Sequence, residues 1–507
     1  MIIGINSKGI ISMETNRWPF FAFLGTSFIF LFFNLWGRSL ENHDYLRYAE
    51  VAKEMIQSGD WIIPRFNGEI FLHKPPLLFW LIALPSKIYG SVTPFLARLP
   101  SAFFAWVGGL IVYLWGRKMW GGERYGLVSS GVLISSSLYF WQGRIARTDM
   151  VFSVLVLLSL YFFYLSYFGK GNYLPPPLPA PKLRQAGSPS PVEGEGVIRS
   201  SSGKGRGRRK ECILTLLSFA FMGMAGLTKG PVGVLFPLLI IFLFVLIQRQ
   251  WKKLFQKEFI LGYLVISFIL GSWVILFIHQ AGWDTALGVW RESKILTRHG
   301  PFYLYLYRIW IDFAPWSIFF PLLFTYLWKK NKSKDEKFLI LWFFCLLLLL
   351  TLFPHRASKY VLPAFPALAL LMGGFWRKWS LIPFLIIFFG AVLVWHGYEY
   401  SLIRKNHIRT PGLALHQVLS PYREKETLGY QMDIDILGKI NFYGNRLVLR
   451  IRRVEDLKKM VRQRKDVLIL TTDRSLQDLM GEGFYLTVLK KIDIKGEILI
   501  LASLNTI

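Results

Sequence analysis

Long apolar stretches alternate with short polar segments from residue 18 to about residue 397. A helix needs about 20 mainly apolar residues to cross the hydrocarbon core of a bilayer. The pattern therefore predicts an all-α polytopic membrane protein with about 11 to 13 transmembrane helices. Eleven can be delimited, at residues 18–36, 95–115, 126–142, 150–169, 212–228, 231–247, 259–278, 314–328, 338–353, 360–376 and 381–397.

The loop after the first predicted span has a helical pattern of its own. "NHDYLRYAEVAKEM" has helical periodicity, with Glu50, Lys53 and Glu54 away from its apolar stripe. The residues on that stripe are Tyr45, Tyr48, Ala49, Ala52, Met55 and Ile56. The later run 76–90 has only about nine strongly apolar residues before Pro85, too few to span. We therefore expect two surface-lying helices in this loop.

The last 110 residues have a different pattern. Short apolar runs, such as "RLVLRI", "DVLILTT" and "GEILILA", alternate with polar helical stretches such as "VEDLKKMVRQ". This alternation predicts a small α/β domain at residues 398–507, after a transmembrane domain at residues 1–397. It has no glycine-rich phosphate motif, which favours a packing or acceptor-guiding role over a second active site.

Residues 170–211 interrupt the apolar pattern. Their core, 174–210, is rich in Pro, Gly and Ser and lacks hydrophobic periodicity, so it predicts a disordered cytoplasmic insertion. Its basic end has the charge to contact anionic lipid, but a simple linker is the better interpretation.

Positive charge predicts how the chain is oriented. The formal net charge is +29, and basic residues gather in the loops 116–125, 170–211, 248–258, 329–337 and 377–380. Basic loops face the cytoplasm in multi-pass proteins. The N-terminus is therefore expected in the cytoplasm and the C-terminal domain outside the cytoplasmic (inner) membrane.

Composition excludes several classes. With 53% hydrophobic and 17% aromatic residues, the chain is too apolar for a soluble protein. The loop charges are explained by orientation, so no nucleic-acid partner is predicted. The only two cysteines, Cys212 and Cys345, lie at or inside predicted spans and imply no disulfide framework.

Further ionisable residues gather at the outer ends of the predicted spans, where topology does not need cations. They are Asp44, Arg65, His73, Lys74, Arg144, Arg147, Asp149, Lys229, Arg291, Lys294, Arg298, His299, His355, Arg356 and Lys359. A rim of basic groups around a few carboxylates at this depth suits an anionic lipid headgroup. Sugar transfer from a lipid phosphate needs cations for the leaving phosphate and a carboxylate for the proton of an acceptor hydroxyl.

Five sequence pieces, in order, resemble a known family. They are the loop "DYLRYAEVAKEMIQSGDWIIPRFNGEIFLHKPPLLFWLIAL", then "ARLPSA", "RIARTDM", "LTKGPVG" and "SKYVLPAFPALALL". They resemble the aminoarabinose–lipid A transferases and the wider group of protein-O-mannosyltransferase-like membrane glycosyltransferases of GT-C fold. The resemblance covers roughly residues 38–376.

The resemblance implies roles for particular residues. Asp44 matches the principal catalytic carboxylate, and Asp149 matches a second acid that faces the same cavity. Lys74 and Tyr360 match residues that bind the donor phosphate.

Other matches are looser. Arg356 or Lys359 stands where relatives carry a cation just before the tyrosine, and Arg298 is the favoured phosphate-binding arginine of the loop after the seventh span. Lys229 and Arg147 are candidate substrate-binding residues. The chain departs from the family at Tyr45, where relatives usually have glutamate.

Ordinary structural roles compete with some of these assignments. Asp44 and Asp149 each begin a helix and suit an N-cap. Lys74 heads an interfacial helix, from which lysines commonly reach lipid headgroups. The histidines outside the membrane are not spaced with carboxylates as a metal cage requires, so no cofactor is predicted. A divalent metal near His73, where relatives often have glutamate, stays an open alternative without support from the sequence.

We therefore predict an inverting glycosyltransferase that moves a sugar from a polyprenyl-phosphate donor. The acceptor is an envelope glycolipid of lipid A type, a polysaccharide or a protein. A transporter or flippase of lipid-linked sugars is the main alternative. It should place polar residues or broken helices near mid-membrane, whereas the predicted span interiors are nearly free of charge. An oligosaccharide ligase would use the same donor phosphate chemistry with a preassembled glycan.

Overall fold

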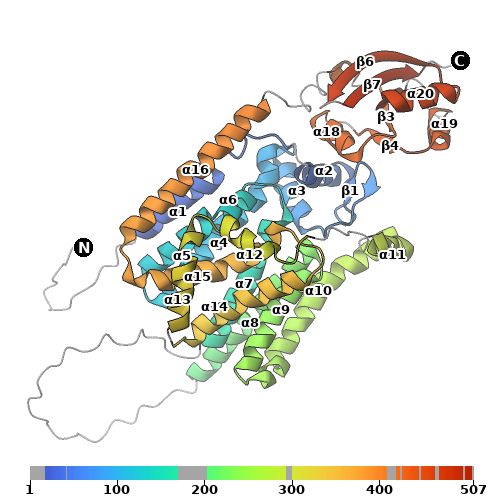
Figure 1. Cartoon of the computed structure of the whole chain (residues 1–507). Coiled ribbons are helices and arrows are strands. Elements are labelled where there is room, and N and C mark those ends of the chain that lie inside the picture. The colour runs from blue at the N-terminus through green and yellow to red at the C-terminus, as the bar shows by residue number, and fades with distance from the viewer. Residues whose placement is uncertain are drawn as a thin grey trace, which may run out of the picture.

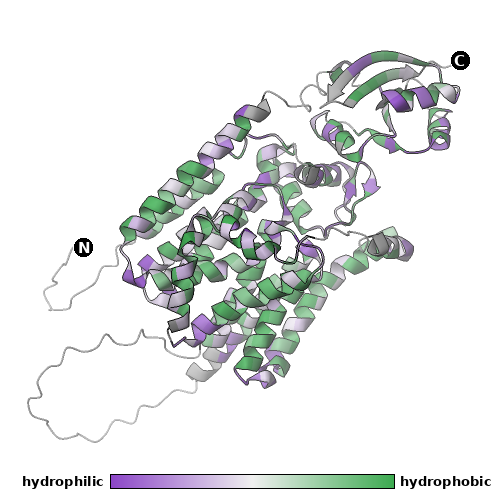
Figure 2. Cartoon of the chain, viewed as in Figure 1, coloured by the Kyte–Doolittle hydropathy of each residue, from purple (hydrophilic) through white to green (hydrophobic). Residues whose placement is uncertain are grey.

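The computed structural model shows a bundle of long helices with a small sheet domain at one end (Figure 1). It describes residues 18–40, 43–169, 202–292, 300–329, 331–407, 418–422, 425–444, 447–462, 467–494 and 497–504. Apolar residues dominate the bundle, and polar residues are frequent in the sheet domain (Figure 2). The predicted fold class, polytopic α-helical with a C-terminal α/β region, is confirmed.

Each of the eleven predicted segments contains helix. The helices are α1 (Trp18–Phe32), α4 (Pro94–Trp120), α5 (Glu123–Ser135), α6 (Ser137–Gly143), α7 (Thr148–Phe168), α8 (Ser202–Lys229), α9 (Val232–Ile247), α10 (Lys257–Ala281), α13 (Phe320–Lys329), α14 (Lys334–Leu352), α15 (Phe365–Phe375) and α16 (Leu381–His407). Short 3-10 and α-helices join them: η1 (Trp251–Phe255), α11 (Trp283–Glu292), α12 (Leu304–Asp312), η3 (Trp316–Phe319), η4 (Ser358–Ala364) and η5 (Trp376–Lys378).

Not every segment is a single straight span. In the described residues, six helices are long and apolar enough to cross a membrane, or seven if a bent pair is one span. The bent pair is α12 with the segment Trp316–Trp328, which turns by 112°. The segment 126–142 is divided at Ser136, whose extended backbone separates α5 from α6. The count of eleven to thirteen therefore stays a prediction.

The insertion prediction was wrong at its C-terminal end. Residues 170–201 lie outside the described residues, but 202–211, predicted as disordered, form the first turns of α8. Extending an existing helix adds one hydrogen bond per residue and avoids a new nucleation step. The apolar span that follows therefore extends the helix back into a polar segment without periodicity.

The bundle core is aromatic and surrounds the segment η4–α15–η5. This segment, Ser358–Lys378, is 83% buried in its most apolar part, whereas the corresponding parts of α10 and α16 are only 17% buried. Trp342 of α14 donates from its indole nitrogen to the carbonyl of Pro363 at 3.0 Å, and Trp120 of α4 does the same to Leu370 at 2.9 Å. These bonds hold the central segment against its neighbours, while α10 and α16 form the outer surface.

The first loop contains the two expected helices with a hairpin between them, and their position at the membrane surface stays a prediction. Helix α2 (His43–Ser58) precedes strands β1 (Arg65–Phe66) and β2 (Glu69–Ile70), which pair antiparallel, and α3 (Leu77–Tyr89) follows. The apolar stripe of α2 is buried, but so are Glu50, Lys53 and Glu54 on its polar side. The sequence pattern therefore identified only one of the two buried faces of α2.

The C-terminal domain is a five-stranded mixed sheet. Its strands are β3 (Thr427–Tyr430), β4 (Leu449–Ile451), β5 (Leu468–Thr472), β6 (Leu486–Ile494) and β7 (Glu497–Leu504), in the order β4-β3-β5-β7-β6. Strand β3 is parallel to β4 and β5, and β7 is antiparallel to β5 and β6. Helices α18 (Ile434–Gly444), α19 (Val454–Arg462) and α20 (Asp473–Gly481) join the strands, and η6 (Ser420–Tyr422) precedes them. Helix α16 continues to His407, beyond the domain boundary predicted at residue 397.

Buried polar groups attach this domain to the first loop. The ammonium of Lys53 donates to the carbonyls of Asn441 and Phe442 at the end of α18, where a cation complements the helix dipole. The amide of Asn441 donates to Asn67 of the β1–β2 hairpin at 2.7 Å. Glu54 accepts backbone bonds from Asn67 and Gly68 at 2.5 and 3.0 Å. The polar face of α2 is therefore the docking surface of the C-terminal domain.

Candidate active site

A cavity of about 200 Å³ lies where several of the resembling sequence pieces meet. Polar side chains enter it from the segment before α3, the end of α8 and the segment around η4, and apolar side chains from α7, α9 and α14 complete it. The lining residues are Lys74, Phe152, Lys229, Val232, Phe236, Leu350, Phe353, His355 and Tyr360. Two ammonium groups therefore face a largely apolar wall.

Asp149 and Lys229 form a buried ion pair beside this cavity. The Lys229 ammonium lies 2.5 Å from a carboxylate oxygen of Asp149, and the two side chains are 8% and 4% exposed. Arg147 occupies the N-cap position of α7, so Asp149 lies in the first turn instead. Its partner is a lysine from another helix, which favours a role in the site beyond a purely local cap.

Lys229 also contacts two aromatic rings. Its ammonium lies 4.6 Å from the ring centre of Phe152 and 5.0 Å from that of Tyr360. Cation–π contacts stabilise an ammonium that has lost much of its water. Lys229 is the last residue of α8, where a cation also complements the helix dipole. The capping and site interpretations of this residue are therefore compatible.

Lys74 lines the same cavity from a position just before α3. Burial lowers its pKa to about 8, with a further lowering from Lys229 and Lys359 and an opposing effect from the carboxylate of Asp149. Three cations thus act on one carboxylate within a small volume. An anion that entered the cavity would relieve the repulsion among them.

Polar contacts from α12 hold η4 in place. Arg308 donates to Asp312 at 2.7 Å and to the hydroxyl of Ser358 at 3.1 Å, and that hydroxyl in turn donates to Asp312. Ser358 begins η4, so these bonds position the next two residues, Lys359 and Tyr360. The Lys359 ammonium lies 5.8 Å from the Tyr360 ring, but only Tyr360 lines the cavity.

Arg356 and His355 differ from what the sequence suggested. Arg356 donates to the carbonyl of Gly300 at 2.6 Å and to that of Thr351 at 3.1 and 2.8 Å, and it does not line the cavity. His355 does line it, and its buried Nδ1 has no hydrogen-bond partner among the described residues. The sequence placed His355 outside but assigned it no role. The only sequence feature that could have pointed to His355 as a site residue was its position directly before Arg356.

The start of α2 contains the principal predicted carboxylate. Asp44 lies in the first turn of α2, but its side chain is outside the described residues, as are Arg298 and its surroundings. The neighbouring Tyr45, where relatives have an acid, meets Arg147: the guanidinium carbon lies 5.5 Å from the ring centre. Arg147 thus contacts α2 directly.

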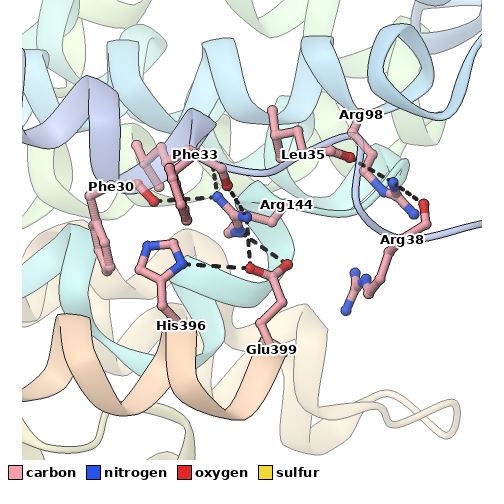
Figure 3. A network of polar contacts seen from close by, with 9 residues as sticks. Phe30, Phe33, Leu35, Arg38, Arg98, Arg144, His396 and Glu399 are labelled. Carbon is pink, nitrogen blue, oxygen red and sulfur yellow. Dashed lines mark hydrogen bonds and ion pairs between the residues drawn. The ribbon is translucent and has the colours of Figure 1, made fainter. Parts of the chain in front are cut away.

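Two buried arginines fix the α1–α2 linker, residues 33–40, which leads into α2. Arg98 of α4 donates to the carbonyls of Leu35, Arg38 and Ser39 at 2.6 to 3.0 Å. Figure 3 shows Arg98 at the backbone near Leu35 and Arg144 between Phe33 and Glu399 of α16. The sequence analysis did not single out Arg98, and it named Arg144 only within the rim of charged residues, without a role of its own.

Arg144 joins the end of α1 to α16. It donates to the carbonyls of Leu31 and Phe33 at 2.7 and 2.5 Å, and its guanidinium pairs with Glu399 of α16 at 2.7 Å (Figure 3). Its side chain is 0% exposed, and that of Glu399 is 5% exposed. The start of α2 is therefore positioned by interactions deep in the bundle.

The apolar wall of the cavity was not predicted. Phe152 and Phe236 lie inside predicted spans, where a phenylalanine that faces a cavity has the same sequence pattern as one that faces lipid. Within the described parts of the chain, no group of three or more His, Cys, Asp or Glu side chains is arranged to hold a metal ion.

Sequence comparison finds relatives among sugar transferases. Residues 73–172 match the family model of dolichyl-phosphate-mannose-protein mannosyltransferases. An uncharacterized protein of Aquifex aeolicus is 28% identical over 70% of this chain and 63% of its own length. The undecaprenyl phosphate-alpha-4-amino-4-deoxy-L-arabinose arabinosyl transferase 1 of Pseudomonas fluorescens is 25% identical over 72% of this chain and 58% of its own. The chain thus spans less than two thirds of the length of these relatives.

Structure comparison finds the same fold. The crystal structure of ArnT from Cupriavidus metallidurans bound to undecaprenyl phosphate superimposes with a TM-score of 0.73, at 17% identity, over 96% of this chain and 98% of the other. The archaeal oligosaccharyltransferase AglB from Archaeoglobus fulgidus gives a TM-score of 0.54, at 12% identity, over 90% of this chain and 70% of the other. The chain is thus similar in sequence to these transferases, and it has the fold of the ArnT structure, that of a multi-pass membrane protein of GT-C type.

Proposed function

We propose that the protein is an inverting glycosyltransferase that moves a sugar from a polyprenyl-phosphate donor to an acceptor of the cell envelope. The cavity that combines the ammonium groups of Lys74 and Lys229 with an apolar wall is the observation that carries this proposal. Cations suit a phosphate, and the wall suits the first isoprene units of the lipid. Several relatives carry undecaprenyl phosphate in their names, and the Cupriavidus structure is described as bound to it.

The proposed reaction is a single displacement. An acceptor hydroxyl oxygen attacks the anomeric carbon of the donor sugar while Asp44 takes the hydroxyl proton. The bond from that carbon to the phosphate oxygen breaks, and its electron pair stays on the phosphate. One displacement inverts the anomeric configuration, and polyprenyl phosphate is the second product. If the acceptor is itself a phosphate, it arrives ionised and Asp44 orients it instead.

The cations stabilise the departing phosphate. Lys74 and Lys229 line the cavity, Lys359 lies beside Tyr360, and Tyr360 completes the phosphate side. Asp149 holds Lys229 in place through their ion pair. We assign Arg356 to positioning, because its donors are bonded to the backbone of Gly300 and Thr351. Arg298 stays a proposed phosphate ligand on the grounds of sequence alone.

We also propose that the reaction takes place on the outer face of the cytoplasmic membrane. The five basic loops favour an N-terminus inside, and a chain oriented in that way would have Lys74, Asp149 and the C-terminal domain outside. The donor lipid would carry the sugar to this face, so the transfer there would need no nucleotide-activated sugar. Envelope glycolipid, polysaccharide and protein remain the acceptor classes, and the preassembled glycan of an oligosaccharide ligase would use the same phosphate site.

The test is a transfer assay that measures both the release of polyprenyl phosphate and the modification of an acceptor. Purified protein, given a polyprenyl-phosphate sugar and an envelope extract, should release polyprenyl phosphate and modify one extract component, both followed by mass spectrometry. Asp44→Asn should abolish release, because the amide cannot accept the proton. Asp284→Asn, which changes an exposed acid of α11, is the matched control and should keep full activity.

The acceptor arm separates the alternatives. Transfer of one sugar to a glycolipid or protein supports the proposal, and transfer of a long glycan would point to a ligase. Movement of the intact donor across vesicles without any cleavage would instead indicate a flippase. Retained turnover in Asp44→Asn would refute the role of that carboxylate.

A further inference from the structure

A second cavity shares no lining residue with the site described above. It measures about 700 Å³ and lies between the end of α13 and the end of α15 with η5. Its lining residues are Leu322, Thr325, Tyr326, Gly374, Phe375, Arg377, Lys378 and Trp379. None of these eight is acidic, so the cavity has a net positive lining.

The two cavities lie at opposite ends of one span. Tyr360 faces the first cavity near the start of the segment Ser358–Lys378, and Arg377 and Lys378 face the second at its end. At 1.5 Å per residue, 21 helical residues extend about 30 Å, the thickness of the hydrocarbon core. The second cavity is therefore at the opposite membrane face.

The cavity has the chemistry of a membrane interface. The rings of Tyr326 and Phe375 lie 5.7 Å apart, and Trp379, 40% exposed, lies 6.2 Å from Phe375. Aromatic side chains of this kind gather at the level of the headgroups. The neighbouring surface of α13 is apolar and open, with Leu322 48% and Phe324 42% exposed. Acyl chains could lie along that surface below a headgroup in the cavity.

The cations are placed as a headgroup site requires. Arg377 and Lys378 are exposed and adjacent, and the Arg377 guanidinium lies 5.8 Å from the ring centre of Tyr125, which restricts its freedom. A loop that only orients the protein needs charge, but it needs neither a cavity nor an aromatic wall. Basic pockets between helices at the cytoplasmic face are the pattern that binds anionic lipid headgroups.

We infer that this cavity binds the phosphate of an anionic membrane phospholipid through Arg377 and Lys378. The acyl chains of the lipid follow the exposed apolar face of α13. On the predicted topology this is the cytoplasmic leaflet. The inference does not depend on the proposed sugar transfer, because none of its residues belongs to the donor site.

The experiment compares lipids that differ only in charge. Delipidated protein in detergent is titrated with phosphatidylglycerol or with phosphatidylcholine of the same chains. Native mass spectrometry reads the bound lipid, and thermal unfolding reads the stabilisation. Inorganic phosphate is titrated in a separate arm. The variants are Arg377→Gln/Lys378→Gln and a matched control, Lys252→Gln/Lys257→Gln, which removes two exposed lysines of the loop 248–258 outside the cavity.

We expect the wild type to bind phosphatidylglycerol at least tenfold more tightly than phosphatidylcholine, since each cation contributes about fivefold near an anionic surface. The Arg377→Gln/Lys378→Gln variant should lose most of this preference, and the control should keep it. Equal binding of the two lipids by the wild type, or an unchanged preference in the double variant, overturns the inference. Equal stabilisation by inorganic phosphate would mean a simple anion site and also overturns it.

Discussion

Lys74 gives the sharpest test of the donor site, because its charge should change within an accessible pH range. Burial, reinforced by Lys229 and Lys359, lowers its pKa to about 8 from the ordinary value of 10.5. The free protein should then hold about 90% of Lys74 protonated at pH 7 and about 10% at pH 9. On the proposed function, only the ammonium form of Lys74 would attract the donor phosphate.

The expected result is an alkaline limb in kcat/KM for the donor. Above pH 8, kcat/KM should fall about tenfold per pH unit, because this parameter reports ionisation of the free enzyme. Lys74→Arg keeps the charge over this range, so it should remove the limb even if its maximum is lower. Lys74→Met should reduce kcat/KM by about 10- to 100-fold at pH 7, the value of a hydrogen bond to a charged group.

The contribution of Lys74 to the free energy of unfolding changes with pH in the opposite direction to kcat/KM, and it therefore controls for unfolding. The folded state holds Lys74 with a depressed pKa, so it binds fewer protons there than the unfolded chain does. This group therefore adds stability as pH rises from about 8 towards 10.5. Loss of activity at pH 9 cannot then come from unfolding at this residue. If kcat/KM of Lys74→Arg still fell with a midpoint near pH 8, the alkaline limb could not be assigned to Lys74.

Three other perturbations follow from the buried charges. Lys229→Met should destabilise the protein by about 3–5 kcal/mol by leaving Asp149 buried without its partner, and Asp149→Asn/Lys229→Met should recover part of that loss, as thermal unfolding in detergent would measure; additive losses would mean that the pair is not coupled. Arg144→Met should lower the free energy of unfolding by a similar amount, and Glu399→Gln by less, because only Arg144→Met also removes the hydrogen bonds to the α1 carbonyls. An Arg144→Met variant that unfolds at the wild-type temperature would contradict this. Lys53→Met should increase hydrogen exchange in α18 by about 5- to 100-fold, corresponding to about 1–3 kcal/mol, and unchanged protection would show that Lys53 does not hold the domain.

Much of the fold was available from the sequence because its signals are local. A run of apolar residues predicts a membrane helix wherever that helix packs, and each of the eleven runs contains helix. The strands of the "RLVLRI", "DVLILTT" and "GEILILA" runs were also predicted and are β4, β5 and β7. By contrast β3, four residues long in "TLGY", has no alternating pattern long enough to detect.

The site was predictable only in part, since its interactions join distant positions. The resemblance identified Lys74, Lys229 and Tyr360, which do line one cavity. It could not show that Asp149 pairs with a lysine 80 residues away, nor that the donors of Arg356 are bonded to the backbone. Both facts depend on how helices pack, and no local pattern of polarity encodes that packing.

Helix α2 shows why a correct local pattern can lead to an incomplete interpretation. Its periodicity assigns Glu50, Lys53 and Glu54 to a face away from the apolar stripe, and that face would be solvated in an isolated loop. Lys53 and Glu54 are buried because the C-terminal domain and the hairpin supply their partners.

At the other end of α2, Tyr45 meets Arg147, and the linker before it is bonded to buried arginines. The backbone of α2 is thus restrained near both ends, and the proposed displacement at one carbon atom would need such a restrained backbone at Asp44. The C-terminal domain, which the sequence pattern predicts as a separate unit, is therefore part of what positions α2.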